Sequence, residues 1–121
     1  MALILVVDDE RDACSMLHRI LSALGHEAVT FTDAHDALRW LQHHTPDLSI
    51  LDFKMQTLNG IQLLKLLRKR DPQARVVILT AYPSAETATE AMQLGAAKYL
   101  IKPIEIDQLE ANVEEVLSSI V

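Results

Sequence analysis

Four short apolar runs, each followed by a polar residue, constrain the fold of this chain most strongly. They are Val6-Val7 before Asp8-Asp9, Leu48-Ser49-Ile50-Leu51 before Asp52, Val76-Val77-Ile78-Leu79 before Thr80, and Tyr99-Leu100-Ile101 before Lys102. Short continuous apolar runs are typical of strands that a parallel sheet buries on both faces. The carboxyl ends of parallel strands meet at one edge of their sheet. The sequence therefore predicts a site at which three carboxylates, a hydroxyl and an ammonium converge.

Strand and helix patterns alternate five times along the chain. The predicted strands are Ala2–Val7, Ala28–Phe31, Leu48–Asp52, Arg75–Thr80 and Lys98–Ile101. The predicted helices are Asp12–Leu24, Ala34 to about His43, Gly60–Arg70, a helix opened by Pro83-Ser84 and closed at Gly95, and Ile106 to about Ser119. This alternation predicts an α/β fold, a flavodoxin-like doubly wound parallel sheet of five strands in the order 2-1-3-4-5 with five helices. In that order Asp8, Asp9 and Asp52 stand at the switch point between strands 1 and 3.

Length and composition limit the class of protein. The 121 residues fit one domain, 1–121, and because half of them are hydrophobic but only 4% are aromatic, the core must be aliphatic. A net charge of -6 argues against direct binding of nucleic acid. Met1 leads directly into a strand and no apolar run approaches the length of a membrane span, so neither a signal peptide nor a membrane anchor is expected. The lone Cys14 lies among apolar helix residues, which predicts a core thiol and a reducing cytoplasm.

The predicted cluster of carboxylates has a definite electrostatic requirement. Carboxylates about 4 Å apart repel one another by roughly 4 kcal/mol at an effective dielectric of 20. The cluster therefore needs a divalent cation, a shared proton or a nearby lysine. Mg²⁺, or Mn²⁺ in its place, prefers oxygen ligands of this kind.

These polar positions also resemble the receiver domain of bacterial two-component response regulators, over essentially the whole chain. The resemblance is carried by Asp8-Asp9, Asp52, Thr80-Ala81 and Lys102-Pro103, by Gly60 at the start of the third helix, and by Tyr99 three residues before the lysine. The segment from Leu79 to Ala96 is also similar to receivers that precede the ATPase domain of nitrogen-regulation-type transcription activators.

The resemblance implies a role for each site residue. Asp52 would accept a phosphoryl group from a sensor histidine kinase or a phosphotransfer protein. Asp9 and Asp52 would be direct metal ligands together with the backbone carbonyl of Lys54, and Asp8 would act through a bound water. Lys102 would supply a second cation, and its bond to Pro103 is expected to be cis.

The resemblance also implies how the signal leaves the site. Thr80 would bind the phosphoryl group, and Tyr99 would rotate into the space that this opens. The surface formed by the fourth helix, the fifth strand and the fifth helix would then change, and it would control an output domain, a partner or a homodimer. One position departs from the family pattern: Gln56 stands where proline is usual, so this loop is expected to be more mobile.

Two other readings remain open at this stage. Asp52 could be the nucleophile of an aspartyl-phosphate phosphatase, but the position that such enzymes use for a general acid, two residues later, is Lys54. The chain could also be a receiver-like module that binds partners without phosphorylation, although its acidic set is complete. The five histidines are predicted to be solvated and neither metal ligands nor phosphorylated groups.

Overall fold

The five predicted strands form one parallel sheet. The computed structural model describes residues 1–53 and 58–118. Within them the strand order is β2-β1-β3-β4-β5, as predicted. The strands are β1 (Leu3–Val7), β2 (Glu27–Phe31), β3 (Leu48–Asp52), β4 (Val76–Thr80) and β5 (Lys98–Ile101).

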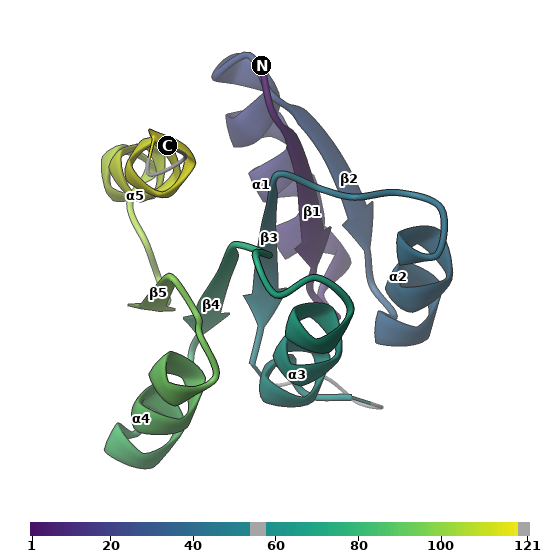
Figure 1. Cartoon of the computed structure of the whole chain (residues 1–121). Helices are drawn as coiled ribbons and strands as arrows, with labels where there is room; N and C mark the ends of the chain where they lie inside the picture. The colour runs from purple at the N-terminus through teal and green to yellow at the C-terminus, as the bar shows by residue number, and fades with distance from the viewer. Residues whose placement is uncertain (54–57, 119–121) are drawn as a thin grey trace.

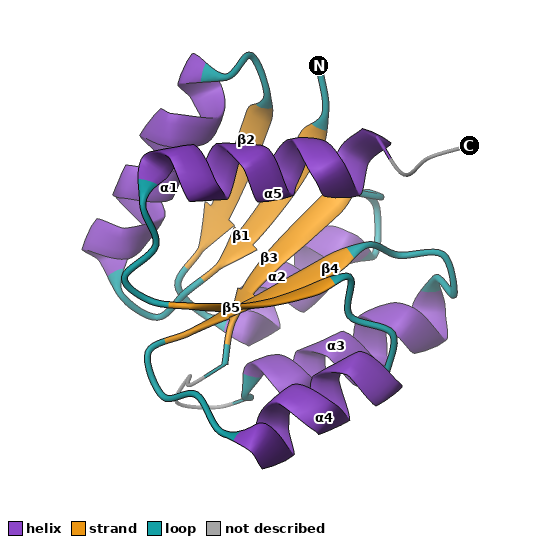
Figure 2. Ribbon diagram, turned by 90° about the vertical axis from the view of Figure 1, so that its left-hand side faces the viewer, coloured by secondary structure: helices purple, strands orange, loops and turns teal. Residues whose placement is uncertain are grey.

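Five helices of the described part cover the two faces of this sheet (Figures 1 and 2). They are α1 (Arg11–Ala23), α2 (Ala34–Leu41), α3 (Gly60–Arg70), α4 (Ala85–Gln93) and α5 (Ile106–Ser118). Helices α1 and α5 cover one face, and α2, α3 and α4 cover the other (Figure 2). The flavodoxin-like α/β prediction is thus confirmed, with element ends that differ from the predicted ones by at most about two residues. The predicted end of the last helix at Ser119 lies outside the described residues.

The core consists of two aliphatic clusters, one on each side of the sheet. Alternate residues of β1 divide between them, since Leu5 and Val7 face α2 and α3 whereas Ile4 and Val6 face α1 and α5. Burying a Val, Leu or Ile side chain fully contributes about 1.5–3 kcal/mol. Cys14 joins the second cluster at 4% exposure, which confirms the predicted core thiol.

Local signals in the sequence fix the ends of several helices. Asp33 accepts a hydrogen bond from the backbone N–H of His35 and so caps the start of α2. Asn59 and Gln62 form a reciprocal pair of hydrogen bonds at the start of α3. Gly95 follows α4 at φ +94°, a backbone conformation that a side chain would strain. Asp33 and Asn59 thus begin α2 and α3 just after the carboxyl ends of β2 and β3, whereas Gly95 ends α4 at the opposite edge of the sheet, before β5 begins.

One surface prediction, that all five histidines are solvated, is wrong. The side chain of His26 is not solvated but only 9% exposed. Its Nδ1 accepts a hydrogen bond from the backbone N–H of Ala2, and its Nε2 lies 3.1 Å from Glu114 Oε1.

No helix in residues 1–53 or 58–118 has both the length and the apolar character that crossing a membrane requires.

Candidate functional site

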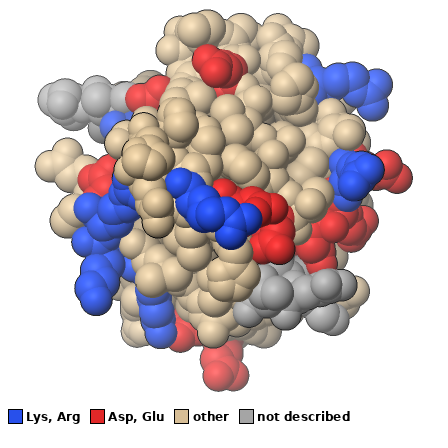
Figure 3. Space-filling view, turned by 90° about the vertical axis from the view of Figure 1, so that its right-hand side faces the viewer, with Lys and Arg blue, Asp and Glu red and all other residues tan. Residues whose placement is uncertain are grey.

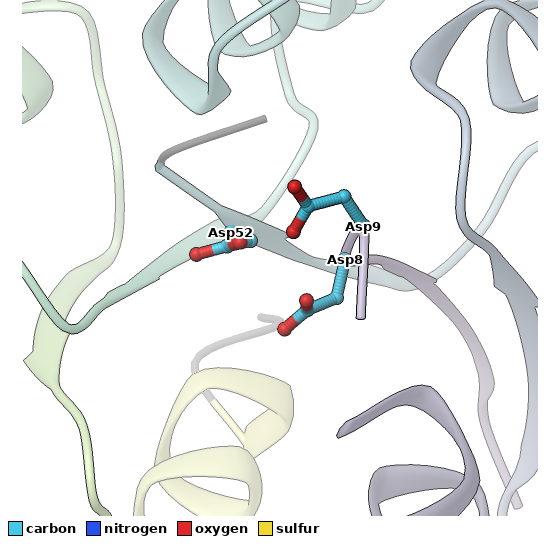
Figure 4. Close-up of side chains that lie close together, drawn as sticks. All are labelled: Asp8, Asp9 and Asp52. Atoms are coloured by element: carbon cyan, nitrogen blue, oxygen red, sulfur yellow. The ribbon is translucent and has the colours of Figure 1, made fainter. Parts of the chain in front are cut away.

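Three carboxylates meet where β1 and β3 end. Val7 pairs with Leu51 in the sheet, so that Asp8 and Asp52 follow directly opposed residues. One oxygen from each of Asp8, Asp9 and Asp52 lies within 4.8 Å of the others. Figure 4 shows Asp8 and Asp9 extending from the end of β1 toward Asp52 at the end of β3. The structure therefore brings together the acidic residues that the sequence singled out.

Lys102 supplies the positive charge of this cluster. Its Nζ lies 2.7 Å from Asp8 Oδ2 and 3.5 Å from Asp52 Oδ1, so its main partner is Asp8. The backbone of Lys102 is anchored as well, because its N–H donates to the carbonyl oxygen of Thr80 over 2.7 Å. The Lys102-Pro103 peptide bond is cis, as predicted.

The local environment shifts the pKa values of Asp52 and Lys102. Burial of Asp52 and the nearby charge of Asp8 raise the pKa of this carboxyl from 3.8 to about 6, although Lys102 opposes the shift. Burial of Lys102 by itself lowers the pKa of its ammonium, but the hydrogen bond and charge of Asp8, together with Asp52, outweigh burial and raise it. The lysine therefore stays charged, and a further cation would stabilise the ionised form of Asp52.

The two neighbouring aspartates differ in how many contacts they already make. Asp8 is 2% exposed, and its carboxylate accepts hydrogen bonds from Lys102 and from the backbone N–H of Glu10 at 2.9 Å. Asp9 is exposed, and no hydrogen bond or ion pair occupies its carboxylate within the described residues. Asp9 thus has both oxygens available for a hard cation, whereas each oxygen of Asp8 already accepts one hydrogen bond.

Gly60 holds the end of β3 against the start of α3. A Cβ at this position would lie 2.6 Å from the carbonyl oxygen of Asp52 and 3.0 Å from the Cα of Phe53, which is too close for any side chain. The N–H of Gly60 donates to the carbonyl of Phe53 over 2.8 Å. The glycine that the sequence pattern indicated therefore lets α3 pack directly on the backbone of Asp52.

Thr80 and Tyr99 lie on the adjacent strands β4 and β5, and no hydrogen bond joins their side chains. Thr80 is fully buried, and its hydroxyl accepts a hydrogen bond of 2.9 Å from the backbone N–H of Tyr82. The hydroxyl of Tyr99 lies 2.7 Å from Thr87 Oγ1 and accepts from the N–H of Ser84 at 3.3 Å. Sequence analysis missed Thr87 and assigned Ser84 only to a helix start, although a hydroxyl pair at positions 84 and 87 is a recognisable signal for a helix cap.

Two sequence predictions near the site cannot be placed. The backbone carbonyl of Lys54, predicted as a metal ligand, and the substituted position Gln56 lie outside the described residues.

Comparison with known proteins gives one consistent result. The profile of the family described as "Response regulator receiver domain" matches residues 4–114. The transcriptional regulatory protein ZraR of Escherichia coli K12 is 38% identical over 115 residues, which is 95% of this chain and 26% of that protein. The DNA-binding transcriptional regulator NtrC of the same strain is 37% identical over 113 residues, 93% of this chain and 24% of that protein.

Among solved structures, a protein with a similar name and length is also similar to this chain. NtrX from Brucella abortus, crystallised with ATP, superimposes with a TM-score of 0.91 at 38% identity, covering 98% of this chain and 27% of the NtrX chain. The chain therefore spans about a quarter of the length of these relatives.

Proposed function

The chain belongs to the response regulator receiver family, and we therefore propose that Asp52 accepts a phosphoryl group in a Mg²⁺-dependent reaction. Among receivers it is similar to those of the nitrogen-regulation type. The observation that carries the proposal is the placement of three carboxylate oxygens within 4.8 Å of one another, with the Lys102 ammonium beside them. We treat residues 1–121 as one receiver domain.

The donor atoms suit Mg²⁺, or Mn²⁺, because they are carboxylate oxygens on a partly open edge of the sheet. Asp9 and Asp52 would hold the ion, and the Lys54 carbonyl is proposed as a third ligand. Asp8 would contact the ion through water, since each of its oxygens already accepts a hydrogen bond, one from Glu10 N–H and one from Lys102. The bound ion would supply positive charge that offsets the crowded carboxylates and attracts phosphoryl oxygens.

The transfer itself needs a nucleophile and positive charge. An oxygen of the ionised Asp52 forms a bond to phosphorus while the bond from phosphorus to the donor atom breaks, and the electron pair of that bond leaves with the donor. Lys102 lies within 3.5 Å of Asp52 and can turn its ammonium from Asp8 toward the incoming phosphoryl oxygens. The product is an aspartyl-phosphate at the end of β3.

The proposed readout begins at Thr80. Its hydroxyl now accepts from Tyr82 N–H, and it would instead donate to a phosphoryl oxygen on Asp52. That change draws the loop after β4 inward, and the loop leads directly to Ser84 and Thr87, which hold the Tyr99 hydroxyl. The α4-β5-α5 surface would thereby switch between two arrangements, and phosphorylation would bias their populations.

The partners follow from this chemistry. We propose a sensor histidine kinase or a phosphotransfer protein as phosphodonor, acting in the cytoplasm. Because the relatives are transcription regulators about four times as long, control of an output domain, or of a second copy through the α4-β5-α5 surface, is the proposed output. Direct contact of this domain with DNA is not proposed, given its net charge of -6.

Incubation with a small-molecule phosphodonor tests the function. Wild type is expected to gain one phosphoryl group by intact mass when Mg²⁺ is present, and to gain none with excess chelator. Asp52→Asn removes the proposed nucleophile and should gain none in either condition. A stable adduct on Asp52→Asn, or on wild type in chelator, would reject the assignment; Glu110→Gln, an exposed carboxylate change on α5, serves as the matched control.

Calorimetric titration with Mg²⁺ distinguishes the roles of the two neighbouring aspartates. Asp9→Ala is expected to weaken Mg²⁺ binding more than Asp8→Ala, because it removes an inner ligand whereas Asp8→Ala removes only an outer contact. Asp8→Ala also frees Lys102 to approach Asp52. Equal losses in the two variants would remove the distinction between direct and water-mediated ligation.

A further inference from the structure

A cavity of about 230 Å³ lies on the α2 and α3 side of the sheet, beside the first residues of β3 and β4. Residues at the end of α2, at the end of α3 and in the two loops that follow these helices line it, and it is partly open to solvent. Figure 1 shows where α2 and α3 lie. Ser49 lines it, and Ser49 precedes Asp52 by three residues in β3, a distance of about 10 Å along a strand. The cavity is therefore separate from the carboxylate cluster and lies toward the opposite end of the same strand.

Ser49 is an unusual residue for its position. The other residues of β1, β3 and β4 that precede Asp8, Asp52 and Thr80 are all aliphatic. It is 1% exposed, and the described residues offer no hydrogen-bond partner to its hydroxyl. Ser49 is one of the residues that line the cavity, so a molecule bound there lies next to it. A buried hydroxyl of this kind favours a ligand that can hydrogen-bond to it.

The charge around the cavity is positive in a protein that is negative overall. Arg70 and Arg75 both line it, and neither forms an ion pair among the residues that the structure describes. One nitrogen of Arg75 lies 3.4 Å from the carbonyl oxygen of Asp47, which leaves the rest of its guanidinium available. Asp71 is the one carboxylate among the lining residues, so the lining carries two formal positive charges and one negative charge.

Several basic side chains gather on one part of the surface. Figure 3 shows the side of the molecule that lies at the right of Figure 1, with a group of Lys and Arg side chains along its left-hand edge and further ones at its centre and right, beside Asp and Glu side chains. The last turn of α3 carries Arg68, Lys69 and Arg70. An anion approaching the end of α3 therefore meets a locally basic surface.

The remaining lining residues include apolar side chains and a histidine ring. Leu41 and Leu67 line the cavity and are 2% and 4% exposed. His44 also lines it, with its ring stacked on Trp40 at a centroid distance of 4.5 Å and its Nδ1 2.9 Å from the Trp40 carbonyl oxygen. Because a carbonyl oxygen only accepts, Nδ1 carries the hydrogen, and the ring orientation is fixed by two contacts.

We propose that this cavity binds a small organic monocarboxylate. The carboxylate would meet the guanidinium groups of Arg70 and Arg75, which suit it geometrically, and the Ser49 hydroxyl would donate a further hydrogen bond. The apolar body of the molecule would lie against Leu41 and Leu67. A single negative charge matches the excess of one positive charge, and the volume, below the usual range of roughly 300–1,000 Å³ for ligand pockets, suits a compact molecule.

Titration with benzoate, followed by ¹H–¹⁵N NMR at constant ionic strength and without Mg²⁺, tests the proposal. Saturable shifts are expected in the amides of residues 44–49 and 67–75, with none at Asp8, Asp9 or Thr80. Arg75→Gln should weaken binding about tenfold, as expected for loss of a charge-assisted hydrogen bond. Ser49→Val should abolish binding, because valine fills part of the cavity and removes the hydroxyl.

Matched controls separate this site from general attraction of anions. Lys65→Gln removes an exposed positive charge from α3 outside the cavity and should leave benzoate binding unchanged. Benzyl alcohol, which lacks the charge, and inorganic phosphate, which lacks the apolar body, should both bind more weakly than benzoate. The proposal is wrong if benzoate gives no saturable shift at these amides, if Arg75→Gln binds it as tightly as wild type, or if either control compound binds equally well.

Discussion

Asp52→Asn is expected to be more stable than wild type by about 2–3 kcal/mol at pH 8 in the absence of Mg²⁺, even though it removes the residue at the centre of the site. Burial and the charge of Asp8 raise the pKa of Asp52 in the folded protein from 3.8 to about 6. The ionised carboxylate is therefore less favourable in the folded chain than in the unfolded chain. Asparagine has a similar shape and carries no charge, while Lys102 keeps its closer partner Asp8 at 2.7 Å.

The direction of the pH dependence follows from the raised pKa. Below about pH 4 the Asp52 carboxyl is protonated in both the folded and the unfolded chain, so its charge does not lower the stability of wild type. As the pH rises from about 4 to about 6, the unfolded chain releases this proton before the folded protein does, so the stability of wild type falls. The stability of Asp52→Asn relative to wild type should therefore increase between about pH 4 and about pH 6 and stay constant at higher pH.

Urea and thermal unfolding at several pH values between 4 and 8, in chelator, measure this effect. The gain at pH 8 corresponds to roughly 5–15 °C in melting temperature for a domain of this size. Added Mg²⁺ should narrow the difference, because it binds the folded wild type with Asp52 ionised. Glu110→Gln, which changes an exposed carboxylate, should show neither effect. A variant less stable than wild type at pH 8, or a difference independent of pH, would contradict the electrostatic account.

Thr80→Ala is expected to abolish the conformational response to phosphorylation while leaving phosphorylation itself possible. The variant retains Asp52, the other carboxylates and Lys102, so the transfer chemistry is unaffected. It loses the one buried hydroxyl at the end of β4, which now accepts from Tyr82 N–H and is proposed to turn toward the phosphoryl group. Without that hydroxyl, nothing draws the following loop inward, and Tyr99 should stay bonded to Thr87 and Ser84.

NMR or amide exchange of residues 81–95 and 98–101, with and without phosphodonor, measures this response. Wild type and Thr80→Ser, which keeps a hydroxyl, should both change in these segments, whereas Thr80→Ala should not. Thr87→Val preserves shape but removes the 2.7 Å contact to Tyr99, so the unphosphorylated protein should already shift partly toward the switched arrangement. A full response in phosphorylated Thr80→Ala would mean that coupling follows another route.

The sequence predicted those features that depend on backbone periodicity and strand order. Apolar runs identified β1, β3, β4 and β5, and their polar ends placed Asp8, Asp52, Thr80 and Lys102 at one edge of the sheet. The register of parallel strands leaves little freedom there, because residues that follow paired positions must be neighbours. This is why the carboxylate cluster could be anticipated without coordinates.

Side-chain partners were less predictable, because they depend on packing between distant segments. The sequence indicated that a lysine would approach the carboxylates, but not that Asp8, rather than Asp52, would be its closer partner. Nothing local indicated that His26 would be covered by Ala2 and Glu114. The hydrogen bond between Tyr99 and Thr87 likewise joins residues whose separation depends on how α4 packs beside β5.

The central claim is that Asp52 is the phosphoacceptor, and locating the modified atom tests it most directly. An acyl phosphate is reduced by borohydride to the alcohol, so a phosphorylated aspartate becomes homoserine and can be found by peptide mapping. After treatment with phosphodonor and Mg²⁺, homoserine is expected at position 52 alone, and it should be absent in chelator. Homoserine at position 8 or 9, or a phosphorylated protein in which Asp52 remains aspartate, would contradict the account.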